Sequence, residues 1–204
     1  MTLAYSPGGR SASSSRTTKE TVIEVELSLD ESAPPSISTG LPFFDHMLEQ
    51  LGKHGGLALR LSAEGDLQVD SHHTVEDVGM VLGETLATAL SDKAGIRRFA
   101  SVALPLDETL VDVALDISGR AYLRYEVALP PESAPLGTPP FEPQLAEEFW
   151  RSFVQGAGIT LHIALCYGRN PHHILEASFK AVARALRDAV KLEGQEIPST
   201  KGVL

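Results

Sequence analysis

Two copies of a short histidine-rich motif are the residues of this sequence best suited to chemistry. The first is His72-His73-Thr74-Val75-Glu76, and the second is His172-His173-Ile174-Leu175-Glu176. At this composition one His-His-x-x-Glu is expected roughly 0.02 times by chance, and two copies roughly twice in ten thousand sequences. A lone histidine at a helix start is usually a surface residue, but imidazoles and a carboxylate repeated at the same spacing are typical of metal ligands. The repeated motif therefore predicts a metal site.

The spacing inside the motif predicts two ions rather than one. Adjacent helical residues diverge by about 100°, so paired histidines cannot easily ligate one ion together, whereas the glutamate shares a helix face with them. His46 and His162 bring the set to six imidazoles and two carboxylates, which divide evenly into two sites of three His and one Glu. Such nitrogen and oxygen ligands suit Mn(II), Fe(II), Zn(II) or Co(II), and a six-coordinate ion would keep two positions open for substrate. Spacing alone leaves His54 undecided.

Hydrophobic periodicity predicts the elements that position these residues. Alternating apolar and polar residues predict strands, and apolar residues at helical spacing predict helices. The expected strands are 21–29, 57–61, 109–117, 122–129 and 159–165, and the expected helices are 43–51, 73–91, 144–154 and 172–191. Both halves contain strands and helices in the same order, which indicates an internal duplication whose halves share one core.

The composition excludes several classes of protein. Of the 204 residues 43% are apolar, enough for a sizeable core, but no run approaches the 18 apolar residues of a membrane span. A formal net charge of −10 argues against non-specific binding of nucleic acid. The single cysteine, Cys166, excludes an intrachain disulfide framework and a cysteine-rich zinc site, and it fits a cytoplasmic location.

The domain organisation follows from the same patterns. Residues 1–19 are rich in serine and glycine and show no apolar periodicity, so we expect a flexible N-terminal tail, with a short transit peptide as the alternative. The first half-domain is expected at 20–95 and the second at 96–204, fused into one catalytic domain.

Five motifs, in order along the chain, resemble the imidazoleglycerol-phosphate dehydratase family of histidine biosynthesis. They are TGLPFFDHML at 39–48, HHTVED at 72–77, DISGR at 116–120, NPHHILEASFK at 170–180 and PSTKG at 198–202. The resemblance runs from about Arg16 to the C-terminus. The sequence departs from the family pattern at Ala121, where proline is common, and at Arg97, where a small polar residue is usual.

The resemblance implies a fold, an assembly and a cofactor. The fold is α+β, an α/β sandwich of internally duplicated half-domains, each a four-stranded sheet backed by helices. The assembly is a large homo-oligomer, a 24-mer in cubic symmetry, with no nucleic acid or membrane partner. The cofactor is Mn²⁺, two ions per subunit, in sites shared between subunits. The implied metal ligands are His46, His72, His73, Glu76, His162, His172, His173 and Glu176, the same set that the spacing indicates.

The implied activity is that of a hydro-lyase, which removes water from imidazole glycerol phosphate to give imidazole acetol phosphate. The proton on C2 of the substrate is not acidic, because no carbonyl group adjoins it. We hypothesise that the substrate ring is held as a metal-bound imidazolate that expels the C3 hydroxyl, after which a base removes the acidified C2 proton. Glu20 matches a family position close to the substrate's hydroxyls and is the candidate for this proton transfer.

The remaining candidate residues would bind the substrate. Cationic and hydroxyl side chains in the family motifs could converge on its phosphate: Arg98, Arg120, Lys180, Ser199 and Lys201. Residues near the imidazole and glycerol portions complete the candidate set: Glu20, His46, His54, His72, Glu76 and His172. Two other readings stay open on the residues alone. A dinuclear metal hydrolase would use the same ligands to activate water, and a metal-storage or metal-assembled particle would use them only as bridges.

Overall fold

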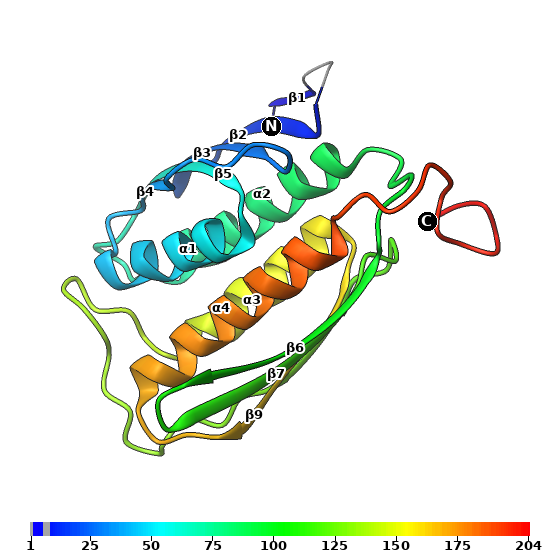
Figure 1. Cartoon of the computed structure of the whole chain (residues 1–204). Coiled ribbons are helices and arrows are strands. Elements are labelled where there is room, and N and C mark those ends of the chain that lie inside the picture. The colour runs from blue at the N-terminus through cyan, green and yellow to red at the C-terminus, as the bar shows by residue number, and fades with distance from the viewer. Residues whose placement is uncertain (1, 6–8) are drawn as a thin grey trace.

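Two β-sheets enclose a double layer of helices in the computed structural model, which describes residues 2–5 and 9–204 (Figure 1). The strands are β1 (Thr2–Tyr5), β2 (Ser11–Thr17), β3 (Thr21–Ser28), β4 (Ser36–Ser38), β5 (Ala58–Gly65), β6 (Phe99–Leu106), β7 (Thr109–Asp116), β8 (Tyr122–Glu126) and β9 (Thr160–Tyr167). The helices are α1 (Pro42–Gly55), α2 (His72–Leu90), α3 (Leu145–Ala157) and α4 (Pro171–Ala189). In the described part of the chain, no helix is both long and apolar enough to span a membrane.

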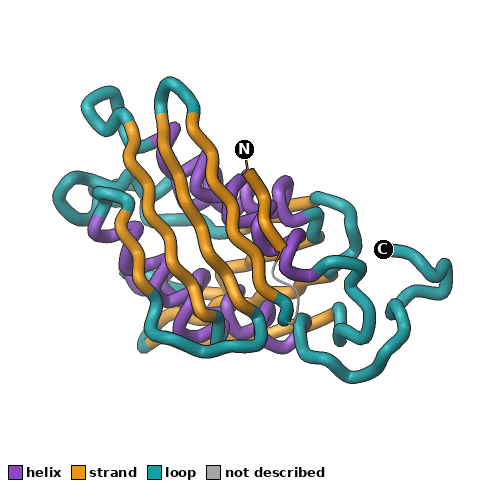
Figure 2. Tube along the Cα trace, turned by 90° about the horizontal axis from the view of Figure 1, so that it is seen from above, coloured by secondary structure: helices purple, strands orange, loops and turns teal. Residues whose placement is uncertain are grey.

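The two sheets have the same connectivity, which confirms the predicted duplication. The first has the order β1-β2-β3-β5-β4 and the second β6-β7-β9-β8. In each, an antiparallel hairpin is followed by a short edge strand that pairs in parallel with the last strand of the unit. Strand β1 is an addition to the first unit, so the expected four-stranded sheet of each half is present and one of them carries a fifth strand. Figure 2, viewed from above, shows the strands of both sheets with helices between them.

The helices bury their apolar faces against the sheets and against each other. α2 packs on β2 and β3 and α4 packs on β6 and β7, while α2 contacts α3 and α1 contacts α4 across the middle of the molecule. Aromatic side chains fill this helical layer, with Phe149 stacked on Phe179 at 5.3 Å between ring centroids and Trp150 completely buried. The halves therefore share one core, since neither sheet-and-helix unit could bury its helices alone.

The N-terminal segment is the largest error of the sequence-based prediction. Residues 11–17, expected to belong to a flexible tail, form β2 and pair with β3 from Ser28 to Val22. Ala12 and Ser14 face the core, and the Ser14 hydroxyl lies 2.7 Å from the hydroxyl of Thr85 on α2. Small residues make this buried face, so it lacks the bulky alternation by which strands are usually identified. Residues 1 and 6–8 of the expected tail lie outside the described residues.

Glycines allow α2 and α3 to approach closely. A Cβ atom added to Gly83 would overlap the backbone carbonyl oxygen of Phe153, and one added to Gly79 would lie 2.6 Å from the carbonyl oxygen of Phe149. Backbone atoms cannot move aside as a flexible side chain can, so overpacking here outweighs the gain of about 1 kcal/mol in helix propensity from glycine to alanine.

Gly83→Ala is therefore expected to lower the free energy of unfolding by about 1–3 kcal/mol, measured by denaturant titration. The matched control is Gly194→Ala, since an added Cβ there meets nothing within 4 Å. Equal stability of the two variants would contradict the close approach of the two helices.

Candidate metal centre and active site

The two histidine pairs occupy the first turns of α2 and α4, where neighbouring polar side chains fix the start of each helix. Asn170 caps α4, its side-chain oxygen accepting hydrogen bonds from the backbone N–H groups of His172 and His173. Asp70 accepts a hydrogen bond of 2.8 Å from the backbone N–H of His72. Such caps satisfy N–H groups that have no partner within the helix, and they hold the histidines in helical register.

The rings within each pair diverge. The centroids of His72 and His73 lie 6.4 Å apart with their planes at 88°, and those of His172 and His173 lie 6.2 Å apart at 87°. His172 points toward Glu176, with 3.0 Å between its Nε2 and the Oε2 of Glu176, whereas His173 points toward a different carboxylate, described below. The two histidines of this pair therefore contact different carboxylates.

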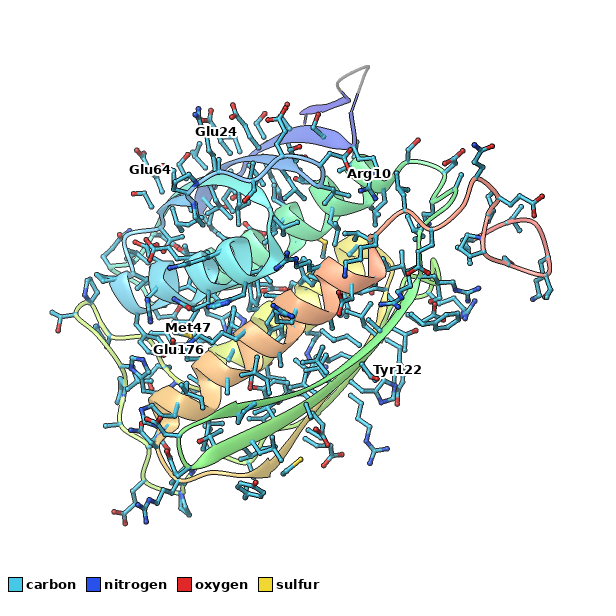
Figure 3. All side chains as sticks on the ribbon, viewed as in Figure 1. Arg10, Glu24, Met47, Glu64, Tyr122 and Glu176 are labelled. Atoms are coloured by element: carbon cyan, nitrogen blue, oxygen red, sulfur yellow. The ribbon has the colours of Figure 1, made fainter. Side chains whose placement is uncertain are left out.

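His46, His172 and Glu176 form a cluster between α1 and α4, at the place where Figure 3 labels Glu176. One ligand atom from each of the three residues lies within 4.8 Å of the others, and among the described residues this is the one such group of three or more metal-type side chains. The Nε2 of His46 lies 3.7 Å from the Oε2 of Glu176. Two imidazole nitrogens and one carboxylate oxygen converging in this way fit a divalent transition-metal ion.

The electrostatics of this cluster favour an ionised carboxylate. Partial burial acts to raise the pKa of Glu176, but the Lys180 ammonium, 2.6 Å from its Oε1, and the two imidazoles outweigh it, so the pKa lies below its ordinary value. The ionised form of a carboxylate is the form that binds a metal ion. Lys180 is thus placed beside a predicted metal ligand.

His54 joins the same region through a chain of side-chain contacts on α1. The Nδ1 of His46 lies 3.3 Å from the amide nitrogen of Gln50, whose oxygen lies 3.2 Å from the Nε2 of His54. Burial, followed by the charge of Lys180, lowers the pKa of His54 and favours its neutral form. Gln50 therefore connects His54 to the cluster. The spacing of the motifs leaves the role of His54 undecided and does not point to Gln50.

A second group surrounds the start of α2. The Nε2 of His72 lies 3.5 Å from the Oε2 of Glu76, one turn along the helix. The Nδ1 of His73 lies 3.1 Å from the Oδ2 of Asp66 in the segment after β5, and this hydrogen bond raises the pKa of His73. Glu20, just before β3, lies nearby with its Oε2 4.0 Å from the same nitrogen and with 54% of its side chain exposed. The predicted proton-transfer residue therefore lies beside a predicted metal ligand.

His173 has a carboxylate partner of its own. Its Nδ1 lies 2.8 Å from the Oε2 of Glu108, in the turn between β6 and β7. This contact, with smaller contributions from backbone N–H groups such as that of Asn170, lowers the pKa of Glu108 to about 2. Sequence reasoning missed both Asp66 and Glu108. Glu108 could have been found, because it precedes β7 as Glu20 precedes β3.

His162 is separate from the other predicted ligands. It lies on the exposed face of β9, the face away from the helices, with its ring centroid 5.7 Å from that of Tyr122, which Figure 3 labels at the outer surface of the second sheet. The eight predicted ligands thus occupy several positions in the described chain, and only His46, His172 and Glu176 converge within it.

The predicted phosphate-binding residues also divide into groups. Arg98 makes two contacts with the Asp116 carboxylate, at 2.7 and 3.2 Å, and donates a hydrogen bond of 2.8 Å to the carbonyl oxygen of Pro198. Arg120 lies 3.7 Å from the same carboxylate. Through Pro198 this group is joined to Ser199, whose hydroxyl accepts a 3.2 Å hydrogen bond from the backbone N–H of Lys201.

Comparisons with known proteins show which family this chain resembles. Residues 39–186 match the family model described as imidazoleglycerol-phosphate dehydratase. A curated protein of that name from Anaeromyxobacter sp. (strain Fw109-5) is 53% identical over 189 residues, covering 93% of this chain and 91% of the relative. Another, from Carboxydothermus hydrogenoformans, is 53% identical over 195 residues, covering 96% of this chain and all of the relative.

Solved structures agree with the sequence matches. The imidazoleglycerol-phosphate dehydratase of Staphylococcus aureus superposes with a TM-score of 0.79 at 40% identity, covering 89% of this chain and 99% of that one. The structure from Pyrococcus furiosus, solved in complex with (S)-C348, gives a TM-score of 0.77 at 37% identity, with 94% and 100% covered. This chain therefore belongs to the imidazoleglycerol-phosphate dehydratase family of hydro-lyases.

Proposed function

We propose that this chain is a metal-dependent enzyme of histidine biosynthesis that dehydrates imidazole glycerol phosphate to imidazole acetol phosphate. The observation that carries the proposal is the cluster of His46, His172 and Glu176, in which the second histidine motif meets a histidine of α1. Family membership supplies the substrate class. The cationic side chains near the C-terminus suit the phosphate of such a substrate.

The proposed cofactor is Mn²⁺, two ions per subunit, held by the eight ligands that the motifs indicate. When bound, the ions would act as Lewis acids toward the substrate's imidazole ring and lower its pKa, which would favour the proposed loss of the C3 hydroxyl. Because the ligands lie in separate groups and His162 faces outward, we propose that neighbouring subunits complete each site in a large homo-oligomer, a 24-mer by analogy. The free, exposed Cys166 is consistent with the cytoplasmic location we propose.

Glu20 is the proposed proton-transfer residue. Its half-exposed carboxylate lies 4.0 Å from the Nδ1 of His73 and has no closer ion-pair partner among the described residues. A carboxylate in this state is free to take the proton from C2 of a substrate bound beside the metal ligands. Asp66, rather than Glu20, holds the His73 ring, which leaves the Glu20 side chain available.

The proposed phosphate site predicts a change in substrate affinity. A phosphate contact from a charged side chain is worth about 1.5–3 kcal/mol, so Lys201→Ala is expected to raise KM about 10- to 100-fold with a smaller effect on kcat. Lys191→Ala is the matched control, since Lys191 pairs with Asp188 and lies outside the family motifs. Steady-state kinetics measure both, and an unchanged KM for Lys201→Ala would remove Lys201 from the phosphate site.

The proposed reaction is tested by incubating the metal-loaded protein with imidazole glycerol phosphate and analysing the product by mass spectrometry. A product lighter by one water, with a ketone and an intact phosphate, supports dehydration. Release of inorganic phosphate would instead favour a metal hydrolase. No conversion, together with binding of many ions per subunit, would favour a storage particle.

A further inference from the structure

The duplication provides an internal comparison between two corresponding carboxylates. Glu20 and Glu108 each precede a buried threonine at the start of the second hairpin strand, Thr21 of β3 and Thr109 of β7. In the first half Thr21 pairs with Gly65 at the end of β5. In the second half Thr109 lies against Gly168, just after β9, where an added Cβ would come within 2.7 Å of its hydroxyl. Glu20 and Glu108 are therefore structural counterparts, as are His73 and His173.

The counterparts make different contacts. Glu108 lies 2.8 Å from the Nδ1 of His173, and its side chain is 28% exposed. Glu20 stays 4.0 Å from the Nδ1 of His73, and its side chain is 54% exposed. In the first half Asp66 makes the contact with histidine instead. Its Oδ2 lies 3.1 Å from the Nδ1 of His73, and its side chain is 17% exposed.

At the position that corresponds to Asp66, the second half has no carboxylate that could contact the histidine. Asp66 directly follows Gly65, and the residue directly after Gly168 is Arg169. A guanidinium has no acceptor atom, so it cannot take the N–H of a histidine. The second half must therefore use the hairpin carboxylate for this contact, whereas the first half has a separate residue for it.

We propose that Asp66 and Glu108 are positioning residues that accept the Nδ1–H of His73 and His173 and so direct the Nε2 of each ring toward a metal ion, and that the presence of Asp66 leaves Glu20 free for proton transfer. This inference rests on the proposed metal-dependent function. A carboxylate behind a ligating histidine fixes the ring's tautomer and orientation and strengthens it as a ligand. Asp66 and Glu108 act through the histidines and not on the substrate.

The test measures Mn²⁺ affinity, by competition with a coloured chelator, in the full-length protein and three alanine variants. Asp66→Ala and Glu108→Ala are expected to bind Mn²⁺ 10- to 100-fold more weakly than the unmodified protein. Glu20→Ala, the matched control near the same histidine, is expected to keep its Mn²⁺ affinity while losing turnover. Asp66→Asn and Glu108→Gln retain an acceptor oxygen and are expected to recover most of the affinity, which would not follow from a folding defect.

The possible outcomes separate this inference from the proposed function. If the unmodified protein binds no Mn²⁺, the proposed function fails. If it binds Mn²⁺ but Asp66→Ala and Glu108→Ala bind equally well, or if Glu20→Ala loses as much affinity as Asp66→Ala, the inference is overturned. Thermal unfolding of the metal-free proteins reports whether each variant folds. Where an alanine variant does not fold, its amide variant decides: it keeps the acceptor oxygen but loses the charge, so it is expected to bind Mn²⁺ a few-fold more weakly than Glu20→Gln, and equal binding would overturn the inference.

Discussion

Glu176→Gln is expected to lower kcat/KM by more than 100-fold and to reduce the Mn²⁺ content of the purified protein. Changes to residues behind a metal ligand already cost 10- to 100-fold, and Glu176 is proposed as a ligand itself. The amide keeps the shape of the side chain but removes the charge that faces His46, His172 and Lys180. The loss should therefore come from metal binding and charge rather than from packing.

Glu193→Gln is the matched control for this change. Glu193 pairs with Arg97 on the surface, at 3.0 Å, and lies outside the family motifs. Metal analysis and steady-state kinetics of both variants, with thermal unfolding to verify the fold, separate a local effect from a general one. Normal metal content and near-normal turnover in Glu176→Gln would show that the cluster between α1 and α4 is not a metal centre.

Glu20→Gln is expected to lower kcat about 10²- to 10⁴-fold, the usual contribution of a positioned general acid or base. The amide cannot accept a proton, but it can still make a hydrogen bond, so KM should change little. Mn²⁺ content should stay intact because the Nδ1 of His73 is held by Asp66 rather than by Glu20. Single-turnover and steady-state rates measure the effect, and turnover close to normal with full metal content would assign the proton transfer to another group.

Periodicity located the long helices to within two residues at each end. The expected helix at 73–91 is α2 (His72–Leu90), and the one at 172–191 is α4 (Pro171–Ala189). Their apolar residues recur at helical spacing because both helices bury one broad face, as Leu175, Phe179 and Val182 do in α4. In these two helices the spacing of apolar residues in the sequence matches the face that is buried in the fold.

The strands that the sequence analysis missed are short or lack a bulky alternating face. β4 has three residues, and the buried positions of β2 are Ala12 and Ser14. β6 has the sequence FASVALPL, which is almost continuously apolar and contains Pro105. Apolar and polar residues therefore do not alternate along it, although the face of the strand that carries Phe99 is exposed. Their places in the sheets depend on pairing with β5, β3 and β7, and such long-range pairing leaves no periodic signal in the strand itself.

The ligand types of the site were predictable, but their grouping was not. The motifs named His46, His172 and Glu176, yet only the packing of α1 on α4 brings the first of these to the other two. Asp66 lies six residues before its histidine motif and Glu108 lies far from His173 in sequence, so local spacing does not connect them. The duplication does connect Glu108 to Glu20, and the comparison of corresponding positions is how such a residue could be found.

The most direct test of the central claim is the turnover of imidazole glycerol phosphate by metal-stripped protein, with and without added Mn²⁺. We expect no ketone formation without metal and recovery of turnover as Mn²⁺ is added, because the proposed loss of the C3 hydroxyl needs the Lewis acidity that the ions would supply. Undiminished turnover in protein shown to be free of metal would contradict the proposed metal-dependent dehydration, and so would bound Mn²⁺ without any turnover.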